Sequence, residues 1–164
     1  MKFKKALCAV MAGVTALTSV VMTVPAAAED TKTFGDFEYK IDGSKVTITN
    51  YIGDDSNVYI PNFIDDREVT TIGNNAFKEK SVEHVRFPAY LETIGSNAFC
   101  NCKDLQEAVL PQSLKLIEDG AFSGSGIADV VFGGDVKITE YGVSGTQFAF
   151  CDNLQTVTLY PSCL

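Results

Sequence analysis

One short phrase occurs three times in this 164-residue chain at nearly constant spacing. The copies are Ile72–Phe77 (IGNNAF), Ile94–Phe99 (IGSNAF) and Ile117–Phe122 (IEDGAF). Their closing Phe residues are 22 and then 23 positions apart. A period in the twenties indicates a small unit stacked on copies of itself, which presents a long surface rather than one enclosed core. The sequence therefore predicts a repeat solenoid.

Each repeated Phe is followed by a turn and then by a segment with the pattern of a short strand. These segments have apolar residues at their first, fourth and sixth positions, and they are residues 82–88, 105–111, 127–133 and 154–159. Because the fourth and sixth positions are two apart, they lie on one buried face of a strand. Pro88 and Pro111 end two of the strands, since proline has no N–H to donate to a sheet. We therefore expect mainly short parallel strands.

A second wall is expected between each strand and the repeated phrase. Leu91 and Ile94, and one repeat later Leu114 and Ile117, are apolar residues three apart. The Gly, Asn and Asp residues nearby disfavour long helices, so loops with short extended or 3₁₀ pieces are expected. The Ala and Phe of the phrase then pack between the two walls. One such coil cannot bury its own apolar face, so at least about three are needed for a stable stack.

The chain divides into three parts. Residues 1–28 have the order of a secretory signal peptide, because three lysines precede the uncharged run 6–24, and Pro25-Ala26-Ala27-Ala28 follows it. The run approaches the length of a membrane span, but its small-residue end favours cleavage over anchoring. We expect residues 29–61 to form an N-terminal extension and a β-hairpin cap, and residues 62–164 to form a repeat array of about four coils.

The two ends of the array look different in the sequence. At the first end, residues 37–41 and 46–48 alternate around Asp42-Gly43-Ser44, which predicts a β-hairpin, and residues 58–61 form a first, degenerate strand. At the other end the strand 154–159 would expose its edge, and an unpaired edge invites pairing with another chain. Either the C-terminal residues cover it, or it forms a homodimer, or the chain is a shortened copy of a longer array.

The charge limits the class of partner. Removing residues 1–28 takes away three lysines and no acidic residue, so the net charge falls from −8 to −11. An acidic surface repels phosphate backbones, which makes nucleic acid an unsuitable partner, and it keeps a secreted protein soluble. The chain is thus expected to be secreted or at the cell surface, without a stable membrane anchor after cleavage.

Four cysteines follow the predicted signal peptide: Cys100, Cys102, Cys151 and Cys163. Cys102 and Cys151 occupy the same position two repeats apart, which separates them by roughly 10 Å and is too far for a disulfide. Buried small hydrophobic residues are the favoured interpretation for this pair, while Cys100 and Cys163 stay open. With one histidine and no paired Cys-x-x-Cys, a zinc site is disfavoured, and no metal or cofactor is expected.

The outward strand positions are the candidate binding face. If the sixth strand position points inward, the fifth points outward, and the outward residues form two columns across the array. The first contains Tyr59, Arg86, Val109, Val131 and Thr158, and the second contains Asn57, His84, Glu107, Asp129 and Thr156. A mixed, partly apolar column is typical of recognition surfaces, although β-propensity alone also selects Tyr, Val and Thr.

The residues of the second repeat carry a resemblance to a known family. Residues 102–122 match the BspA-like leucine-rich repeat, which is similar to Cys-x-x-Leu-x-x-Val-x-Leu-Pro followed by Leu-x-x-Ile-Gly-x-x-Ala-Phe. Three departures occur. In the third repeat, Gly124 stands in the Cys position and Gly133 in the Pro position. The fourth repeat is longer, with Val143 in the Ile position and extra residues within 133–145. The resemblance implies bacterial secreted or cell-surface proteins, some adhering to host or bacterial partners, with no catalytic machinery and no cofactor.

The functional hypothesis is a secreted, non-catalytic binding or adhesion module for a protein or glycan. One alternative is a secreted hydrolase using surface carboxylates, but catalysis needs convergent polar groups, and Asp54-Asp55 and Asp65-Asp66 are better interpreted as turn residues. A truncated structural array without a partner is the other alternative. The predicted site thus consists of the outward columns, and no catalytic residue is assigned.

Overall fold

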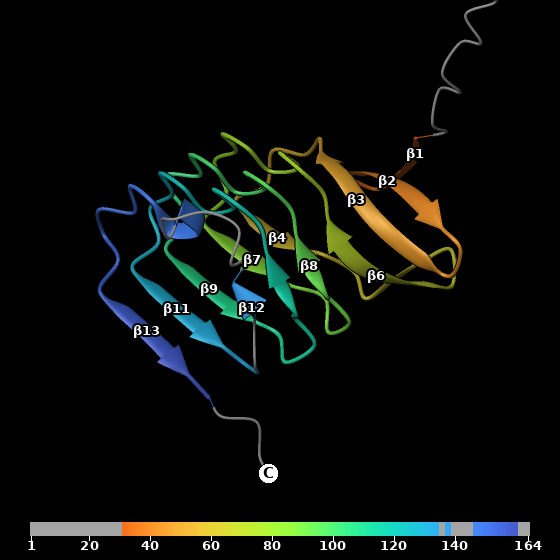
Figure 1. The fold of residues 1–164 in the computed structure, drawn as a ribbon. Helices are drawn as coiled ribbons and strands as arrows, with labels where there is room; N and C mark the ends of the chain where they lie inside the picture. The colour runs from red at the N-terminus through yellow and green to blue at the C-terminus, as the bar shows by residue number, and fades with distance from the viewer. Residues whose placement is uncertain (1–30, 135–136, 139–145, 161–164) are drawn as a thin grey trace, which may run out of the picture.

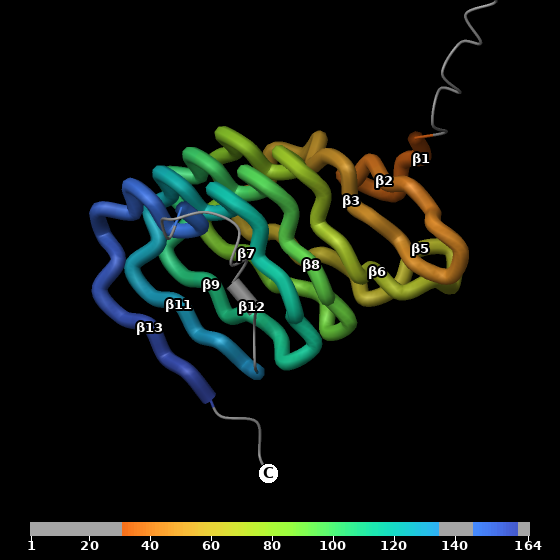
Figure 2. The backbone as a smooth tube through the Cα atoms, in the orientation of Figure 1, coloured from red at the N-terminus to blue at the C-terminus, as the bar shows by residue number. Residues whose placement is uncertain are grey.

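The structure is a computed structural model that describes residues 31–134, 137–138 and 146–160. The predicted signal peptide, Val143 and Cys163 lie outside these residues. The described chain forms a β-solenoid of about five turns, which confirms the predicted fold class. Figure 1 shows the coils side by side along one axis, and Figure 2 shows the backbone winding from one coil into the next.

Two sheets form the long walls of the solenoid. Sheet A has the order β1-β2-β3-β6-β8-β10-β12, with β5 paired to β6, and sheet B has the order β13-β11-β9-β7-β4. The strands of sheet A are β1 (Lys32–Phe34), β2 (Phe37–Asp42), β3 (Lys45–Tyr51), β5 (Phe63–Ile64), β6 (Arg67–Ile72), β8 (Thr93–Ile94), β10 (Leu116–Ile117) and β12 (Lys137–Ile138). Those of sheet B are β4 (Asn57–Tyr59), β7 (His84–Arg86), β9 (Glu107–Leu110), β11 (Asp129–Phe132) and β13 (Thr156–Leu159). One 3₁₀ turn, η1 (Thr146–Phe148), precedes the last strand.

Successive strands of the repeat array are parallel, because each coil returns to the same wall in the same direction. In sheet B, β4 pairs with β7, β7 with β9, β9 with β11, and β11 with β13, all in parallel. The strand β4, which the sequence analysis placed with the N-terminal cap, is therefore continuous with the array. The predicted hairpin is present as antiparallel β2 and β3, and β3 joins the array through a parallel pairing with β6.

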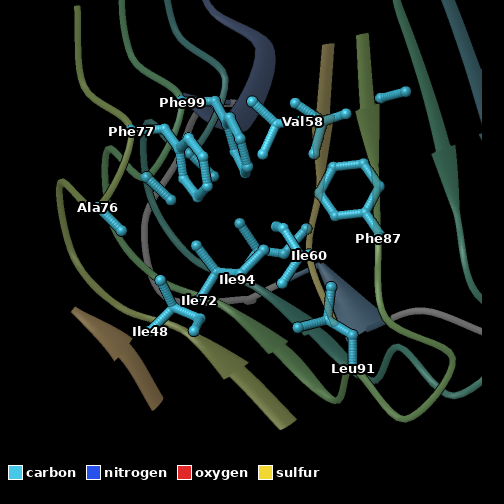
Figure 3. Close-up of a cluster of buried hydrophobic side chains, with 14 of the residues drawn as sticks. Ile48, Val58, Ile60, Ile72, Ala76, Phe77, Phe87, Leu91, Ile94 and Phe99 are labelled. Atoms are coloured by element: carbon cyan, nitrogen blue, oxygen red, sulfur yellow. The ribbon is translucent and has the colours of Figure 1, made fainter. Parts of the chain in front are cut away.

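The repeated Phe residues form one continuous stack through the core. Ring centroids are 4.8 Å apart between Phe77 and Phe99 and 5.2 Å apart between Phe99 and Phe122, with planes within 16° of parallel. Phe148 extends the stack by a further 5.2 Å. Figure 3 shows Phe77 and Phe99 lying face to face above the aliphatic side chains of both walls. The Phe of the repeated phrase thus occupies the centre of the stack, as predicted.

The N-terminal cap supplies the first ring of this stack. Tyr51, the last residue of β3, lies 5.1 Å from Phe77 and is nearly parallel to it. Phe37 covers the same end, 5.5 Å from Tyr51. The backbone continues the pattern, since the Tyr51 N–H donates to the Ala76 carbonyl as the Phe77 N–H donates to Ala98. The cap therefore imitates a coil and closes the first end of the array.

Two columns of left-handed residues bend each coil around its Phe. The position two before Phe holds Asn75, Asn97 and Gly120, with φ of 59°, 55° and 65°. The position two after Phe holds Glu79, Asn101, Gly124 and Phe150, with φ of 62°, 59°, 68° and 56°. Asn and Gly tolerate this backbone conformation, whereas Glu and Phe are strained in it. The Asn and Gly content of the repeated phrase is thus a turn requirement.

Two details of the predicted repeat alignment are wrong. Ile138 of β12 pairs with Ile117 of β10, so Ile138 rather than Val143 holds the sheet A position of the fourth repeat. In the third repeat, Ser125 rather than Gly124 holds the Cys position, since its hydroxyl lies 3.4 Å from the Cys151 sulfur. The chain shortens by one residue after this position, and Gly126 allows the close backbone approach because a Cβ there would meet the Lys103 carbonyl.

Replacing the central ring, Phe99→Ala, is expected to destabilise the protein by about 3–5 kcal/mol, because Phe99 is fully buried with a ring on each side. Urea denaturation followed by circular dichroism measures this loss. Phe148→Ala at the end of the stack should cost less, since this ring is only partly buried. Equal losses at the two positions would contradict a stack stabilised by neighbouring coils.

Replacing a strained turn residue, Glu79→Gly, is expected to stabilise the protein by about 0.5–1 kcal/mol, because glycine adopts the left-handed conformation without a Cβ penalty. The same denaturation assay measures the gain. Glu83→Gly is the matched control, since Glu83 is also exposed but has no positive φ, and it should lose a similar amount. A loss in both variants would show that the turn carries no strain.

Candidate ligand-binding face

Sheet B places both predicted columns on its outer surface. In the first column, Tyr59 pairs with Arg86, Val109 with Val131, and Val131 with Thr158. The second column is aligned without interruption through Asn57, His84, Glu107, Asp129 and Thr156. The residues between the columns, such as Val85, Ala108 and Val130, are buried, which fixes the outward direction of the columns. The sequence therefore identified the residues that share this face.

The first column is partly apolar and exposes two large apolar side chains. Tyr59 is 54% exposed and Val109 55% exposed, although both are large apolar side chains. The Arg86 guanidinium lies 5.2 Å from the centroid of the Tyr59 ring, a cation–π contact that holds both side chains on the surface. This contact was not predicted, because the two residues are 27 positions apart and only the register brings them together.

The second column borders a shallow polar depression. The depression has a volume of about 610 Å³ and is lined mainly by acidic and amide side chains, including Glu83, Glu107, Asp129, Gln106 and Gln155, together with His84 and Lys103. Among the described residues, none of these carboxylates forms an ion pair within the protein. The face therefore combines an apolar column with a neighbouring row of acidic and hydrogen-bonding groups.

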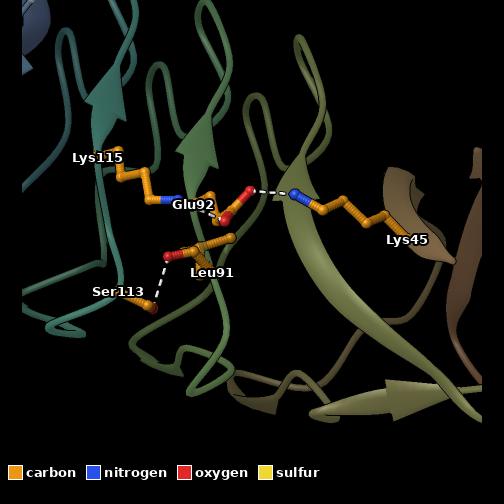
Figure 4. Close-up of polar contacts among 5 residues, drawn as sticks. All are labelled: Lys45, Leu91, Glu92, Ser113 and Lys115. Atoms are coloured by element: carbon orange, nitrogen blue, oxygen red, sulfur yellow. Dashed lines mark hydrogen bonds and ion pairs between the residues drawn. The ribbon is translucent and has the colours of Figure 1, made fainter.

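On the outer surface of sheet A, charged side chains pair with one another within the protein. Glu92, directly before β8, accepts from the Lys45 ammonium of β3 at 2.5 Å and from the Lys115 ammonium directly before β10 at 2.6 Å, so it joins three levels of the stack (Figure 4). These two hydrogen bonds, Lys115 first, lower the pKa of the Glu92 carboxyl below its ordinary value of 4.5. The Ser113 hydroxyl beside this group donates to the Leu91 carbonyl. These polar groups stabilise the stack, which leaves sheet B as the better candidate surface.

The carboxylate pairs considered for catalysis have structural partners. Asp65 and Asp66 form the tight turn between β5 and β6, and the Tyr39 hydroxyl donates to the Asp65 carboxylate at 2.7 Å. This hydrogen bond attaches the cap hairpin to the array and raises the pKa of Tyr39. The Asp55 N–H donates to the Tyr51 hydroxyl in a loop before β4. Asp65 and Asp66 thus shape a turn, and Asp55 contributes to its loop through its backbone.

The cysteines also take part in stacking. The Cys102 thiol donates to the Phe77 carbonyl and the Cys151 thiol to the Phe122 carbonyl, each at 3.0 Å, with Ser125 on the level between them. Burial raises the pKa of Cys102 to about 12, so its thiol is not a nucleophile at neutral pH. Cys100, Cys102 and Cys151 are free thiols in the structure. Within the described ranges, no group of three or more His, Cys, Asp or Glu side chains has the arrangement of a metal site.

Parallel coils of 22–23 residues, each with one strand in sheet A, one strand in sheet B and a stacked Phe, define a leucine-rich repeat solenoid. A family model described as "BspA type Leucine rich repeat region" matches residues 59–164 in six copies. The chain therefore belongs to the BspA-type leucine-rich repeat family, which confirms the resemblance found in the sequence. The family suggests a repeat-based interaction module, and such repeat proteins are generally non-catalytic.

Solved bacterial structures have the same architecture. A leucine-rich repeat protein from Bacteroides capillosus has a TM-score of 0.70 and 25% identity, over 80% of this chain and 99% of that one. A leucine-rich cell surface protein from Faecalibacterium prausnitzii has a TM-score of 0.57 and 26% identity, over 79% of this chain and 42% of that one. The search of curated proteins gave no match. Across the part of the chain that the structure describes, no helix is long and apolar enough to span a membrane.

Removing the shared carboxylate, Glu92→Gln, is expected to lower stability by about 0.5–1 kcal/mol at pH 7. The folded pKa of Glu92 lies below its ordinary value, so this contribution is present above about pH 4.5 and is lost as the pH falls through the folded pKa. Urea denaturation of both proteins between pH 7 and pH 3 measures the difference. Glu107→Gln, which removes an exposed carboxylate of sheet B, is the control at pH 7. A difference that stayed constant down to pH 3 would contradict the assignment.

Proposed function

We propose that this protein is an exported, non-catalytic binding module that contacts a protein or glycan partner through the outer face of sheet B. The observation that carries the proposal is the register of five parallel strands, which aligns two columns of outward side chains. A repeat array uses such an extended surface for recognition, since its inward residues are committed to stacking.

The character of the two columns supports recognition by this face. The exposed Tyr59 and the neighbouring Arg86 are residue types enriched where binding energy is concentrated. The acidic and amide side chains of the second column and its depression provide hydrogen-bond acceptors and donors. Within the described chain, their carboxylates form no ion pair with a Lys or Arg side chain. Both a protein surface and a saccharide offer complementary apolar and hydroxyl or amide groups, so both belong to the proposed partner class.

Export and surface display are part of the proposal. The order of charged, apolar and small residues in 1–28 supports cleavage after Ala28, and one structural neighbour is described as a cell surface protein. The adhesion role that the family resemblance implies fits this location. Protein recovered after export is expected to begin at Glu29, which N-terminal sequencing determines.

The partner is to be sought by pull-down from surface extracts of bacterial and host cells and by glycan array, with the exported protein as bait. The double variant Tyr59→Ala with Arg86→Glu is expected to weaken a detected interaction at least tenfold, because it removes the aromatic contact and reverses the charge of the one Arg or Lys side chain in the two columns. Surface plasmon resonance or calorimetry measures the affinity.

The matched control is Phe34→Ala with Lys78→Glu, which makes the same chemical changes at exposed positions outside sheet B. This control should bind as the unmodified protein does. If both double variants bound equally well, the outer face of sheet B would not be the binding surface. Competition by a free saccharide would assign a glycan partner, and its absence with retained binding to a purified protein would assign a protein partner.

A further inference from the structure

The two ends of the solenoid differ in how far their inward-facing apolar residues are exposed. At the first end, the inward residues Val58 and Ile60 are 5% and 0% exposed, because the hairpin β2–β3 covers that end. At the other end, Val157 and Leu159 of β13 are 54% and 70% exposed. The corresponding residues of the preceding strand, Val130 and Phe132, are 1% and 5% exposed. In the described structure, the last strand thus carries core-type residues that no further coil covers.

The backbone of β13 also has a free edge in the described structure. The N–H groups of Thr156 and Tyr160 donate to Ala128 and Phe132, so they point toward β11. Because backbone groups alternate in direction along a strand, the N–H and C=O of Val157 and Leu159 point away from β11. β13 is the outermost strand of sheet B, so these groups face outward at the edge. Such an edge is a template for another strand.

The charge of this edge favours a second copy of the same chain as the occupant. The segment Thr156–Tyr160 has no charged residue, although the whole chain has a net charge of −8. Two acidic proteins approach each other most easily where neither carries charge, since like charges facing each other are destabilising. At the first end, by contrast, Asp54 and Asp55 precede the three-residue strand β4, and the hairpin covers its apolar side. Head-to-tail stacking of copies is therefore disfavoured.

We propose that the protein forms a two-fold dimer in which the β13 strands of two copies pair antiparallel. The free backbone groups require Val157 and Leu159 to lie opposite free residues of the other copy, and one register pairs all four of them with each other. In it, Val157 of one copy exchanges hydrogen bonds with Leu159 of the other, and Thr158 faces Thr158 on the axis. The exposed inward side chains of the two copies then cover each other. The same strand of each copy forms the interface, as two-fold symmetry requires.

This arrangement joins the two candidate binding faces. An antiparallel pair about an axis perpendicular to the sheet keeps the outward side of both copies on the same surface. The five-stranded sheets B then continue into one another, and the column ending at Thr158 runs on into its copy. The dimer proposal depends on the exposed end of the solenoid and not on the proposed partner binding, so either proposal can be wrong while the other holds.

The first test is the mass of the protein in solution. Light scattering after gel filtration, over a hundredfold range of concentration, is expected to show a dimer for the protein purified from its full coding sequence. The variant Val157→Lys with Leu159→Lys should be monomeric, because four lysines would meet at the interface. Both positions are exposed, so the variant should keep its circular dichroism spectrum. Val109→Lys, an equally exposed apolar strand residue, is the matched control and should stay dimeric.

The second test reports the register. Thr158→Cys should cross-link two copies on mild oxidation, because directly opposed residues without mutual hydrogen bonds have Cα atoms about 4.5 Å apart, within disulfide range. Thr156→Cys is the control, since its copies would lie about 13 Å apart. Native cysteines contribute equally to both variants. Non-reducing electrophoresis compares the rates.

A monomer at every concentration would overturn the proposal and would leave the edge to a different protein or to a segment of the same chain. A dimer that survives the two lysines would also overturn it. Equal cross-linking at positions 156 and 158 would overturn the proposed register and with it the two-fold axis through Thr158.

Discussion

The stack of aromatic rings from Tyr51 to Phe148 is the contact on which the rest of the structure depends. Each ring lies about one strand spacing from the next, with centroids between 4.8 and 5.2 Å apart. That spacing equals the distance between paired strands, so ring stacking and backbone pairing of both sheets are satisfied by the same translation. A coil that lost its ring would leave a cavity bordered by two neighbours, and the register of both sheets would lose its common support.

Fixing the interior leaves the outer positions of each coil free to differ. The buried inward positions of sheet B contain Ile, Leu, Val, Ala or Phe, whereas its first outward column contains Tyr59, Arg86, Val109, Val131 and Thr158. Sheet A uses part of this freedom for stability, since Glu92 connects lysines from two other levels of the stack. Sheet B does not, because its acidic side chains have no internal ion pair among the described residues. The charged side chains of sheet A therefore support the stack, whereas those of sheet B are available to a partner, which makes sheet B the candidate recognition surface.

The parts of this structure that follow from repetition could be predicted from the sequence, and the exceptions could not. The solenoid, the buried Phe and both outward columns follow from one period and from strand alternation. Tyr51 was missed as the first ring because its residue type differs and its distance to Phe77 is 26 residues, as in the long last repeat. Ser125 and Ile138 were missed, and Gly124 and Val143 were assigned to their repeat positions instead. A one-residue deletion in the third repeat and an insertion in the fourth change the sequence spacing, whereas the hydrogen bonds identify the equivalent positions in space.

The ends of the array determine what the repeat can do beyond stacking. A repeat unit offers an apolar face in both directions along the axis, and each face must be covered. The first face is covered by a hairpin that imitates a coil, down to the hydrogen bond from the Tyr51 N–H to Ala76. The second face exposes Val157 and Leu159 on an uncharged strand, so only a surface that supplies another strand and apolar side chains can cover it. A second copy of the chain supplies both the strand and the apolar side chains through its own β13. Pairing there would extend the outer face of sheet B without any change in the repeat itself.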